Sequence, residues 1–365
     1  MIRPRSRATD HSPYRELYFP YIIFEPRSNE KNCKIVVLVS SFLELEEAVS
    51  EINQLANEFE ARSITQFKHF VSYLIMRSVL FPFSFLPYRV CIVLGSGLML
   101  LLYPIAYKHR KIAYQNISHA FPELTHKEIL SLVRKHFRFL GVILGCFFYE
   151  QRNPKVWYEN YISYDKESEK IEKAISATGS GVVIVSGHIG NWESMAVYMP
   201  LRLSKVGTLY KPARNPYVSN WVDKRRRNAG TVATIPIDRP TEVLRKLKEG
   251  YWLAFFADQN AGDNGIFIRF LNRPASTHQG PAVMAYMAKV PLVFYTTEYK
   301  GKGKFEISCE DLGIPERLPE ETKEDMIKRT TEIWTKVLET KIRKSPEQYF
   351  WVHRRWKTQP KPLSS

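Results

Sequence analysis

A histidine and a glutamate five positions apart follow an apolar run in the middle of the chain. The run Val182–Ser186, which reads VVIVS, leads directly into GHIGNWE, residues 187–193. A short β-branched run predicts a buried strand, and the start of the helix expected after it offers unpaired amides. We therefore place His188 and Glu193 in a turn beyond the end of a strand, where ligands bind in open α/β sheets.

These two side chains suit a general base and an acid that orients it. A histidine has an ordinary pKa of ~6.5 and can take a proton from a hydroxyl at neutral pH. A carboxylate on its other ring nitrogen fixes the tautomer and stabilises the imidazolium that forms. Gly187 and Gly190 permit the tight turn that brings His188 and Glu193 together. The other interpretation is a buried structural histidine, with Glu193 as an ordinary acid of a first helical turn.

The sequence gives no support to other catalytic arrangements. It contains no G-x-S-x-G elbow, so an acyl-enzyme on a serine of the hydrolase type is not indicated. It contains no H-E-x-x-H, and no pair of its four cysteines has metal-ligand spacing. We predict neither a metal nor a cofactor.

The elements that must position the turn follow an alternating pattern. From Gly179 onward, strand-like runs such as WLAFFA and VPLVFYT alternate with helical stretches such as TEVLRKLKEG and GPAVMAYMAKV. This alternation predicts an α/β fold with a mixed, largely parallel central sheet flanked by helices. Asp258 and Gln259 end one of the strands, so in a parallel sheet they lie at the same edge as His188.

The region before this domain contains a long apolar run. Val90–Tyr107 carries no charged side chain and is bounded by Arg89 and the basic residues 108–111. Its length is just enough to cross or enter a hydrocarbon layer of ~30 Å. We therefore predict an N-terminal membrane helix, either spanning or monotopic, with a buried helix of a soluble core as the alternative. Further along, Thr125 and Glu128 have the spacing of a capping box before an amphipathic helix.

The charge of the chain points to a polyanionic neighbour. Lys and Arg number 53 against 37 Asp and Glu, which gives a formal net charge of +16. Nucleic acid, an anionic lipid surface and an acidic carrier protein all fit such an excess. A nucleic-acid function would need a recognised module or aromatic side chains among exposed cations, and the sequence offers neither. We predict no nucleic-acid partner.

The turn and four further blocks resemble one family of enzymes. GHIGNWE resembles the H-x4-D/E motif of glycerolipid acyltransferases, in the form found in the lipid A biosynthesis acyltransferase family. The resemblance covers about residues 67–357 and departs from the family at Lys211 and at Leu271-Asn272, beside the expected acceptor or acyl channel. The other blocks follow in the family's order: NISHAFPEL (116–124), YKPARNPYVSNWVDKRRRNAG (210–230), ADQNAGDNGIFIRFLNRPASTHQGPAVMA (257–285) and PEQYFWVHRRWK (346–357).

The resemblance implies transfer of a fatty acyl chain from an acyl thioester, with acyl carrier protein as donor, to a hydroxyl or hydroxyacyl group of a lipid A precursor. His188 would deprotonate the hydroxyl, and Glu193 would orient and polarise His188. Backbone amides of the 190–192 turn or a nearby arginine would stabilise the oxyanion. Arg226 would hold a phosphate, and Asp258 with Gln259 would shape the acceptor site or a network behind it. The expected substrate-binding residues are Asn191, Lys211, Arg214, Arg226, Asp258 and Gln259.

The resemblance also implies a place in the cell and a division of the chain. The enzyme would sit at a bacterial inner membrane with its site on the cytoplasmic side, facing acyl carrier protein, a glycolipid acceptor and an anionic membrane surface. We divide the chain into an extension (1–64), a membrane anchor (65–111), an acyltransferase domain (112–358) and a tail (359–365). Two alternatives stay open: an acyl-CoA-dependent enzyme acting on a phosphatidylinositol-mannoside-like or other glycolipid, and a non-catalytic membrane-binding scaffold.

Overall fold

The computed structural model describes residues 63–78, 83, 85–150, 154–210, 213–228, 230–231 and 233–360. By its contacts the chain divides into two units, Met1–Val71 and Ser72–Ser365. Residues 1–62 of the extension predicted over 1–64, and Lys211, lie outside the described residues. The second unit contains the predicted α/β domain.

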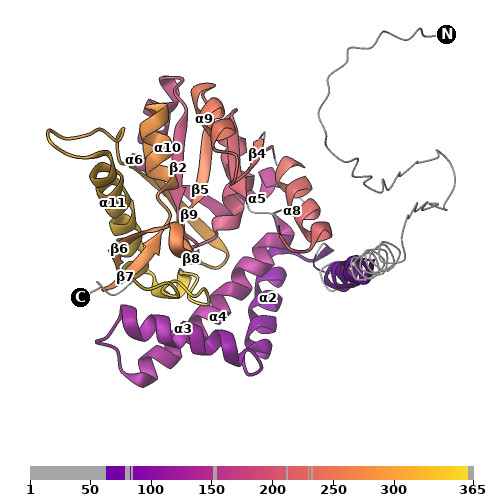
Figure 1. The fold of residues 1–365 in the computed structure, drawn as a ribbon. Helices are drawn as coiled ribbons and strands as arrows, with labels where there is room; N and C mark the ends of the chain where they lie inside the picture. The colour runs from indigo at the N-terminus through magenta and orange to yellow at the C-terminus, as the bar shows by residue number, and fades with distance from the viewer. Residues whose placement is uncertain are drawn as a thin grey trace, which may run out of the picture. The chain divides into compact units, whose positions relative to one another are not determined.

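A seven-stranded mixed sheet forms the centre of the second unit (Figure 1). The strand order is β1–β9–β8–β2–β5–β3–β4; the β8–β9 pair is antiparallel and the other neighbouring pairs are parallel. The prediction of a mixed, largely parallel sheet is confirmed. The strands are β1 (Ile162–Tyr164), β2 (Val182–Ser186), β3 (Val206–Tyr210), β4 (Ala233–Pro236), β5 (Trp252–Phe256), β8 (Leu292–Gly301) and β9 (Lys304–Asp311).

Alternate residues of the central strands face two separate cores. Val183 and Val185 of β2 belong to a buried cluster that includes residues of α9, α10 and α11. Val182 and Ile184 belong to a second cluster, with residues of α6 and α7. Helices therefore cover both faces of the sheet, as expected for strands that are apolar throughout. These helices are α6 (Lys166–Ala177), α7 (Met195–Arg202), α9 (Pro240–Lys248), α10 (Gly280–Ala288) and α11 (Lys323–Lys344).

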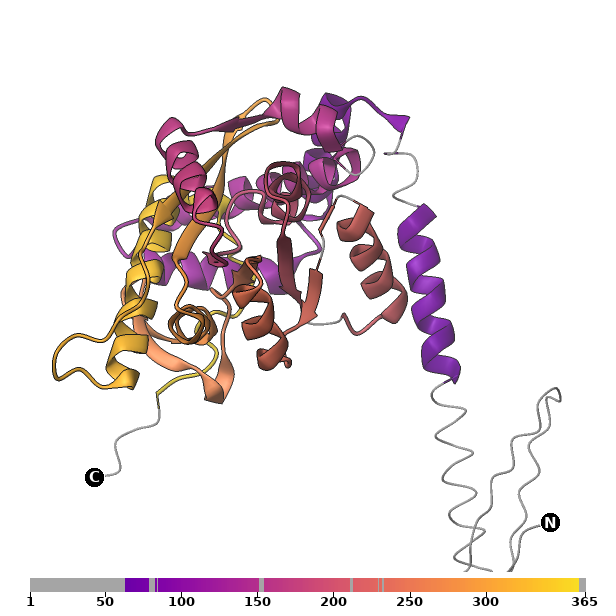
Figure 2. The same cartoon turned by 90° about the horizontal axis from the view of Figure 1, so that it is seen from above.

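Several connections complete the unit. A hairpin of β6 (Ile266–Phe270) and β7 (Arg273–Thr277), which the sequence pattern did not reveal, lies between β5 and α10 in the chain. The loop between β9 and α11 projects from the body (Figure 2). Two further helices belong to this unit. In the sequence, α5 (Pro154–Tyr161) precedes β1, and α8 (Pro216–Asn228) lies between β3 and β4.

The helices α2 (Tyr88–Leu102), α3 (Tyr107–Ala120) and α4 (His126–Tyr149) lie together at one end of the second unit (Figure 1). Glycines let α2 and α4 meet backbone to backbone. A Cβ at Gly95 would overlap the carbonyl oxygen of Gly141, and one at Gly145 would overlap that of Cys91. The capping box of Thr125 and Glu128 at the start of α4 is present as predicted.

The predicted membrane helix over Val90–Tyr107 is not continuous. The helix α2 ends at Leu102, and Pro104 lies in the turn that follows, where its ring cannot continue a helix. In the described part of the chain no single helix has the length and hydropathy to cross a bilayer. The pair of α2 and α3 passes that test together, but the two helices are bent by 96°.

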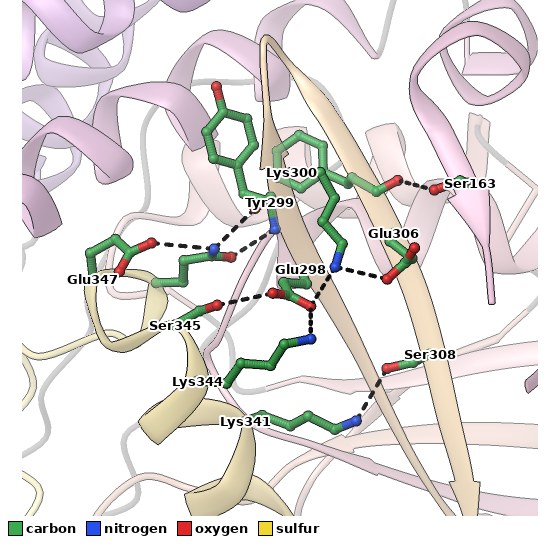
Figure 3. Close-up of polar contacts among 12 residues, drawn as sticks. Ser163, Glu298, Tyr299, Lys300, Glu306, Ser308, Lys341, Lys344, Ser345 and Glu347 are labelled. Carbon is green, nitrogen blue, oxygen red and sulfur yellow. Dashed lines mark hydrogen bonds and ion pairs between the residues drawn. The ribbon is translucent and has the colours of Figure 1, made fainter.

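A polar network joins the end of α11 to the β8–β9 hairpin (Figure 3). The carboxylate of Glu298 on β8 accepts hydrogen bonds from Lys300 at 2.8 Å and from Lys344 and Ser345 at 3.0 Å each. Lys300 also pairs with Glu306 on β9, at 2.9 Å. Burial works against ionisation of Glu298, but these donors outweigh it and lower its pKa from 4.5 to about 2.

We expect Glu298→Gln to reduce stability by about 1–2 kcal/mol at pH 7, after allowance for solvent screening. The pKa of Glu298 is lower in the folded chain, so its contribution is complete above pH 4.5 and is lost as the pH falls through about 2. Urea unfolding of wild type and variant between pH 7 and pH 2 measures the difference, which should shrink below pH 4.5. Glu332→Gln, on the exposed side of α11, is the matched control, with an expected effect below about 0.5 kcal/mol. A difference independent of pH would contradict this origin.

Candidate active site

The turn that carries His188 lies at the carboxyl edge of the sheet, beside the residues that follow β5. Strands β2 and β5 are adjacent and parallel, and Ser186 is paired with Phe256. Two residues beyond this pair, the chains reach His188 and Asp258 at the same level. The prediction that these residues share one edge of the sheet is confirmed.

His188 and Asp258 form two hydrogen bonds with each other. The ring Nδ1 of His188 lies 2.6 Å from Oδ1 of Asp258, and its backbone N–H donates to Oδ2 at 2.9 Å. The carboxylate therefore accepts a hydrogen bond from Nδ1–H, which keeps this proton on Nδ1 and leaves the lone pair of Nε2 to accept another proton. Asp258 is 2% exposed, whereas His188 is 19% exposed, so the pair is anchored in the interior and opens at the imidazole.

The pair shifts the pKa values of both groups. Burial alone lowers the pKa of His188, but the charge and hydrogen bond of Asp258, with a smaller effect from Glu193, raise it above its ordinary value of 6.5. Burial alone raises the pKa of Asp258, but the interaction with His188 holds it below its ordinary value. His188 therefore stabilises a proton once it has taken one, and Asp258 stays ionised.

Glu193 does not make the contact that the sequence predicted for it. It lies in the short helical turn Trp192–Ser194, and its carboxylate oxygens are 3.4 and 3.5 Å from Nη2 of Arg226. The carboxylate on Nδ1 of His188 is Asp258. Our prediction that Glu193 fixes the tautomer of His188 is therefore wrong in its geometry, although Glu193 and Arg226 both face the same pocket as His188.

The segment 346–358, which we call the closing segment, binds the turn that carries His188 through backbone hydrogen bonds. The amide of Gly190 donates to the carbonyl of Gln348 at 3.1 Å, and the amide of Phe350 donates to the carbonyl of His188 at 2.9 Å. Gly190 has φ +61°, and a Cβ there would overlap the carbonyl oxygen of Thr297. Only glycine fits this position, as the sequence suggested.

The imidazole opens into a pocket of about 730 Å³ at the end of the sheet. This volume lies within the usual range for small-ligand sites. The residues that line it include no serine or cysteine in the part of the chain that the structure describes. Its polar members include Glu193, Arg226, Gln259, Asn260 and His278. Its apolar wall includes Met195, Met199, Val206, Leu209, Val243, Ala254, Phe256 and Met284.

The other predicted site residues are not all at the pocket. Asn191 is 1% exposed and is not among the lining residues. Arg214 is exposed on the turn before α8 and does not line the pocket either. Leu271-Asn272, expected beside the acceptor or acyl channel, forms the turn of the β6–β7 hairpin away from the pocket lining. The binding roles of Asn191, Lys211 and Arg214 stay predictions.

Three residues of the closing segment reach the site, and sequence reasoning gave none of them a specific contact. His353 accepts a hydrogen bond on Nε2 from the amide of Asn260, at 3.0 Å. The positive charge of Arg355 is among the influences that lower the pKa of Asp258. Burial raises the pKa of Tyr349, and the nearby charge of Asp258 raises it further. The signal available was the block PEQYFWVHRRWK itself, which places polar groups among buried aromatic residues.

A buried ion pair connects α4 to the helix that carries Arg226. Glu150, at the end of α4, pairs with Arg225 on α8, and both side chains are buried. Arg225 also donates to the carbonyl of Phe147 at 3.2 Å and lies over its ring. Burial raises the pKa of Glu150 to about 7 against the opposing effect of Arg225. Because Arg225 precedes Arg226 on α8, this pair helps to hold the part of α8 that carries Arg226.

Within the described ranges, no three or more His, Cys, Asp or Glu side chains come close enough to hold a metal ion. The polar side chains that line the pocket include two imidazoles, one carboxylate, one guanidinium and two amides, with the carboxylate of Asp258 behind His188. This set suits proton transfer and the binding of anionic or hydroxyl groups.

Comparisons with known proteins identify the family of the chain. Residues 61–358 match the model of the family described as bacterial lipid A biosynthesis acyltransferase. The chain is 27% identical over 290 residues to the lipid A biosynthesis palmitoleoyltransferase of Escherichia coli (strain K12) and to a lipid A biosynthesis acyltransferase of Shigella flexneri. It is 27% identical over 285 residues to the lipid A biosynthesis lauroyltransferase of Escherichia coli (strain K12). Each alignment covers 77% of this chain and 89% of the relative. The chain is therefore an acyltransferase and belongs to the bacterial lipid A biosynthesis acyltransferase family.

Proposed function

We propose that this protein transfers a fatty acyl chain from acyl carrier protein to a hydroxyl or hydroxyacyl group of a lipid A precursor. The observation that carries the proposal is the His188–Asp258 pair, whose free Nε2 faces a pocket with an apolar wall. The names of the relatives support the acceptor class, since each is a lipid A biosynthesis acyltransferase.

The reaction proceeds by direct attack of the acceptor. Nε2 of His188 takes the hydroxyl proton as the oxygen attacks the thioester carbonyl, whose π electrons move to its oxygen. Asp258 stabilises the imidazolium that results. Collapse of the tetrahedral intermediate breaks the carbon–sulfur bond, and the departing thiolate takes the proton from His188. No serine or cysteine lines the described pocket, so neither nucleophile is offered there for an acyl-enzyme, and we propose direct attack.

The pocket lining contains both apolar and charged side chains, which suit different parts of the substrates. Met195, Met199 and Val206 belong to the apolar wall, which suits the acyl chain by excluding water from it. Arg226, paired with Glu193, supplies a cation. A guanidinium at this position suits a phosphate of the glycolipid or of the donor's prosthetic group.

The charge of the chain and the surface of α2 support a membrane location. A net charge of +16 suits an acidic carrier protein and anionic lipid headgroups. Val93, Leu101 and Ile105 are 68%, 75% and 78% exposed, and the cations Arg89 and Lys108 flank the run. Such a surface binds a lipid interface with its apolar side chains inserted. We place the protein at the cytoplasmic side of the bacterial inner membrane.

Mass spectrometry of the lipid product tests the proposal. The full chain is incubated with a tetra-acylated lipid A precursor and acyl carrier protein that bears a C12, C14 or C16 chain. We expect one of the three donors to add a single acyl mass. Transfer from acyl-CoA alone would contradict the assignment of acyl carrier protein as the donor. Transfer to a mannolipid in place of the lipid A precursor would contradict the assignment of the acceptor.

A further inference from the structure

The transfer reaction places a negative charge on the thioester oxygen, and the backbone of the catalytic turn has few donors to offer it. The amide of His188 donates to Asp258, that of Ile189 to the carbonyl of Gly187, and that of Gly190 to Gln348. Gly190 was one of the donors that we predicted from the sequence. Its hydrogen bond to the closing segment removes it from this role, whereas the amides of Asn191 and Trp192 stay predicted donors.

The amide side chain of Gln259 offers a donor directly beside the catalytic nitrogen. Its Nε2 is 3.4 Å from Nε2 of His188, the nitrogen that receives the acceptor's proton. Because Asp258 holds the proton of His188 on Nδ1, Nε2 presents a lone pair, and only the amino group of Gln259 can face it. A carbonyl carbon attacked beside this nitrogen has its oxygen within reach of the same amide.

Both neighbours of Gln259 in the chain are fixed. Asp258, before it, is bound to His188 through both carboxylate oxygens. Asn260, after it, donates its backbone amide to His353 at 3.0 Å, and its side chain donates to Thr358 at 3.0 Å. The backbone of Gln259 is therefore held at both ends before substrate arrives, which is the preorganisation that transition-state stabilisation requires.

We propose that Gln259 is a catalytic residue whose side-chain amide stabilises the oxyanion of acyl transfer, and that His353 positions it through Asn260. The inference rests on the proposed function. It differs from our sequence prediction, in which Gln259 shaped the acceptor site. When substrate binds, the amide of Gln259 exchanges its long contact with His188 for a hydrogen bond to the charged oxygen.

Gln259→Met and Gln259→Glu test this role. Both keep the length of the side chain and remove the donor, and Glu adds a charge that repels an oxyanion. We expect kcat for transfer from acyl carrier protein to fall by roughly 10²–10³-fold with Met, and further with Glu, while KM changes little. Gln115→Glu, on the exposed side of α3, is the matched control and should keep wild-type kcat.

The outcomes separate this inference from the proposed function. Wild-type kcat in Gln259→Met would overturn the oxyanion role, and a rise in KM with kcat unchanged would return Gln259 to acceptor binding. A wild-type chain that transfers no acyl group from any donor would overturn the proposed function as well. If Gln259→Met does not fold, as judged by thermal unfolding, His353→Ala gives the second measurement. It leaves Gln259 in place but frees Asn260, so kcat should fall by roughly tenfold with KM unchanged.

Discussion

Replacing His188 with alanine should lower kcat for acyl transfer by roughly 10³–10⁴-fold. Its Nε2 is the base that faces the pocket, and the buried carboxylate of Asp258 binds its other ring nitrogen. The measurement is the rate of acyl addition to the lipid acceptor by mass spectrometry, with saturating donor. His126→Ala, on the exposed first turn of α4, is the control and should keep full activity.

The result also separates the enzyme from a scaffold. A non-catalytic membrane-binding protein would complement a deletion strain equally well with and without His188. Equal transfer by wild type and His188→Ala would contradict the proposed mechanism, because that mechanism transfers the hydroxyl proton to Nε2 of His188.

Asp258→Asn should lower kcat by roughly 10³–10⁴-fold without unfolding the chain. The substituted amide can donate to Nδ1 of His188, which would move the proton to Nε2 and block its function as a base. Glu193→Gln is the informative comparison, since Glu193 contacts Arg226 instead of the ring. We expect it to cost only about tenfold, through the loss of a more distant charge.

The pH profile distinguishes this effect from simple disruption. His188 must be neutral to act as a base, so the wild-type kcat/KM should rise with pH through a midpoint above 6.5, because Asp258 raises the pKa of His188. In Asp258→Asn this charge is absent and burial lowers the pKa, so the midpoint should fall. A larger loss of kcat in Glu193→Gln than in Asp258→Asn would return the orienting role to Glu193.

The local parts of the site could be predicted from the sequence. The run VVIVS predicted β2, and Gly190 predicted a turn, because strand pattern and positive φ depend on neighbouring residues. The common edge of His188 and Asp258 also followed, given the expectation of parallel strands. These features need no knowledge of how distant segments meet.

The identity of the acid on His188 could not be predicted in this way. Glu193 is five positions from His188 and Asp258 is seventy, so spacing favoured Glu193. The choice depends on the register of β2 against β5, where Ser186 lies opposite Phe256. Each strand fits several registers when it is viewed alone, and the packing of the whole sheet decides among them.

The glycine contact between α2 and α4 has a mechanical consequence. With no side chain between Gly95 and Gly141, the two backbones are in direct contact, and a methyl group at either position would have to push the helices apart. Glu150 at the end of α4 pairs with Arg225, the neighbour of Arg226. A single methyl group between α2 and α4 is therefore expected to act at a distance, by displacing the helix that carries a charged residue of the pocket.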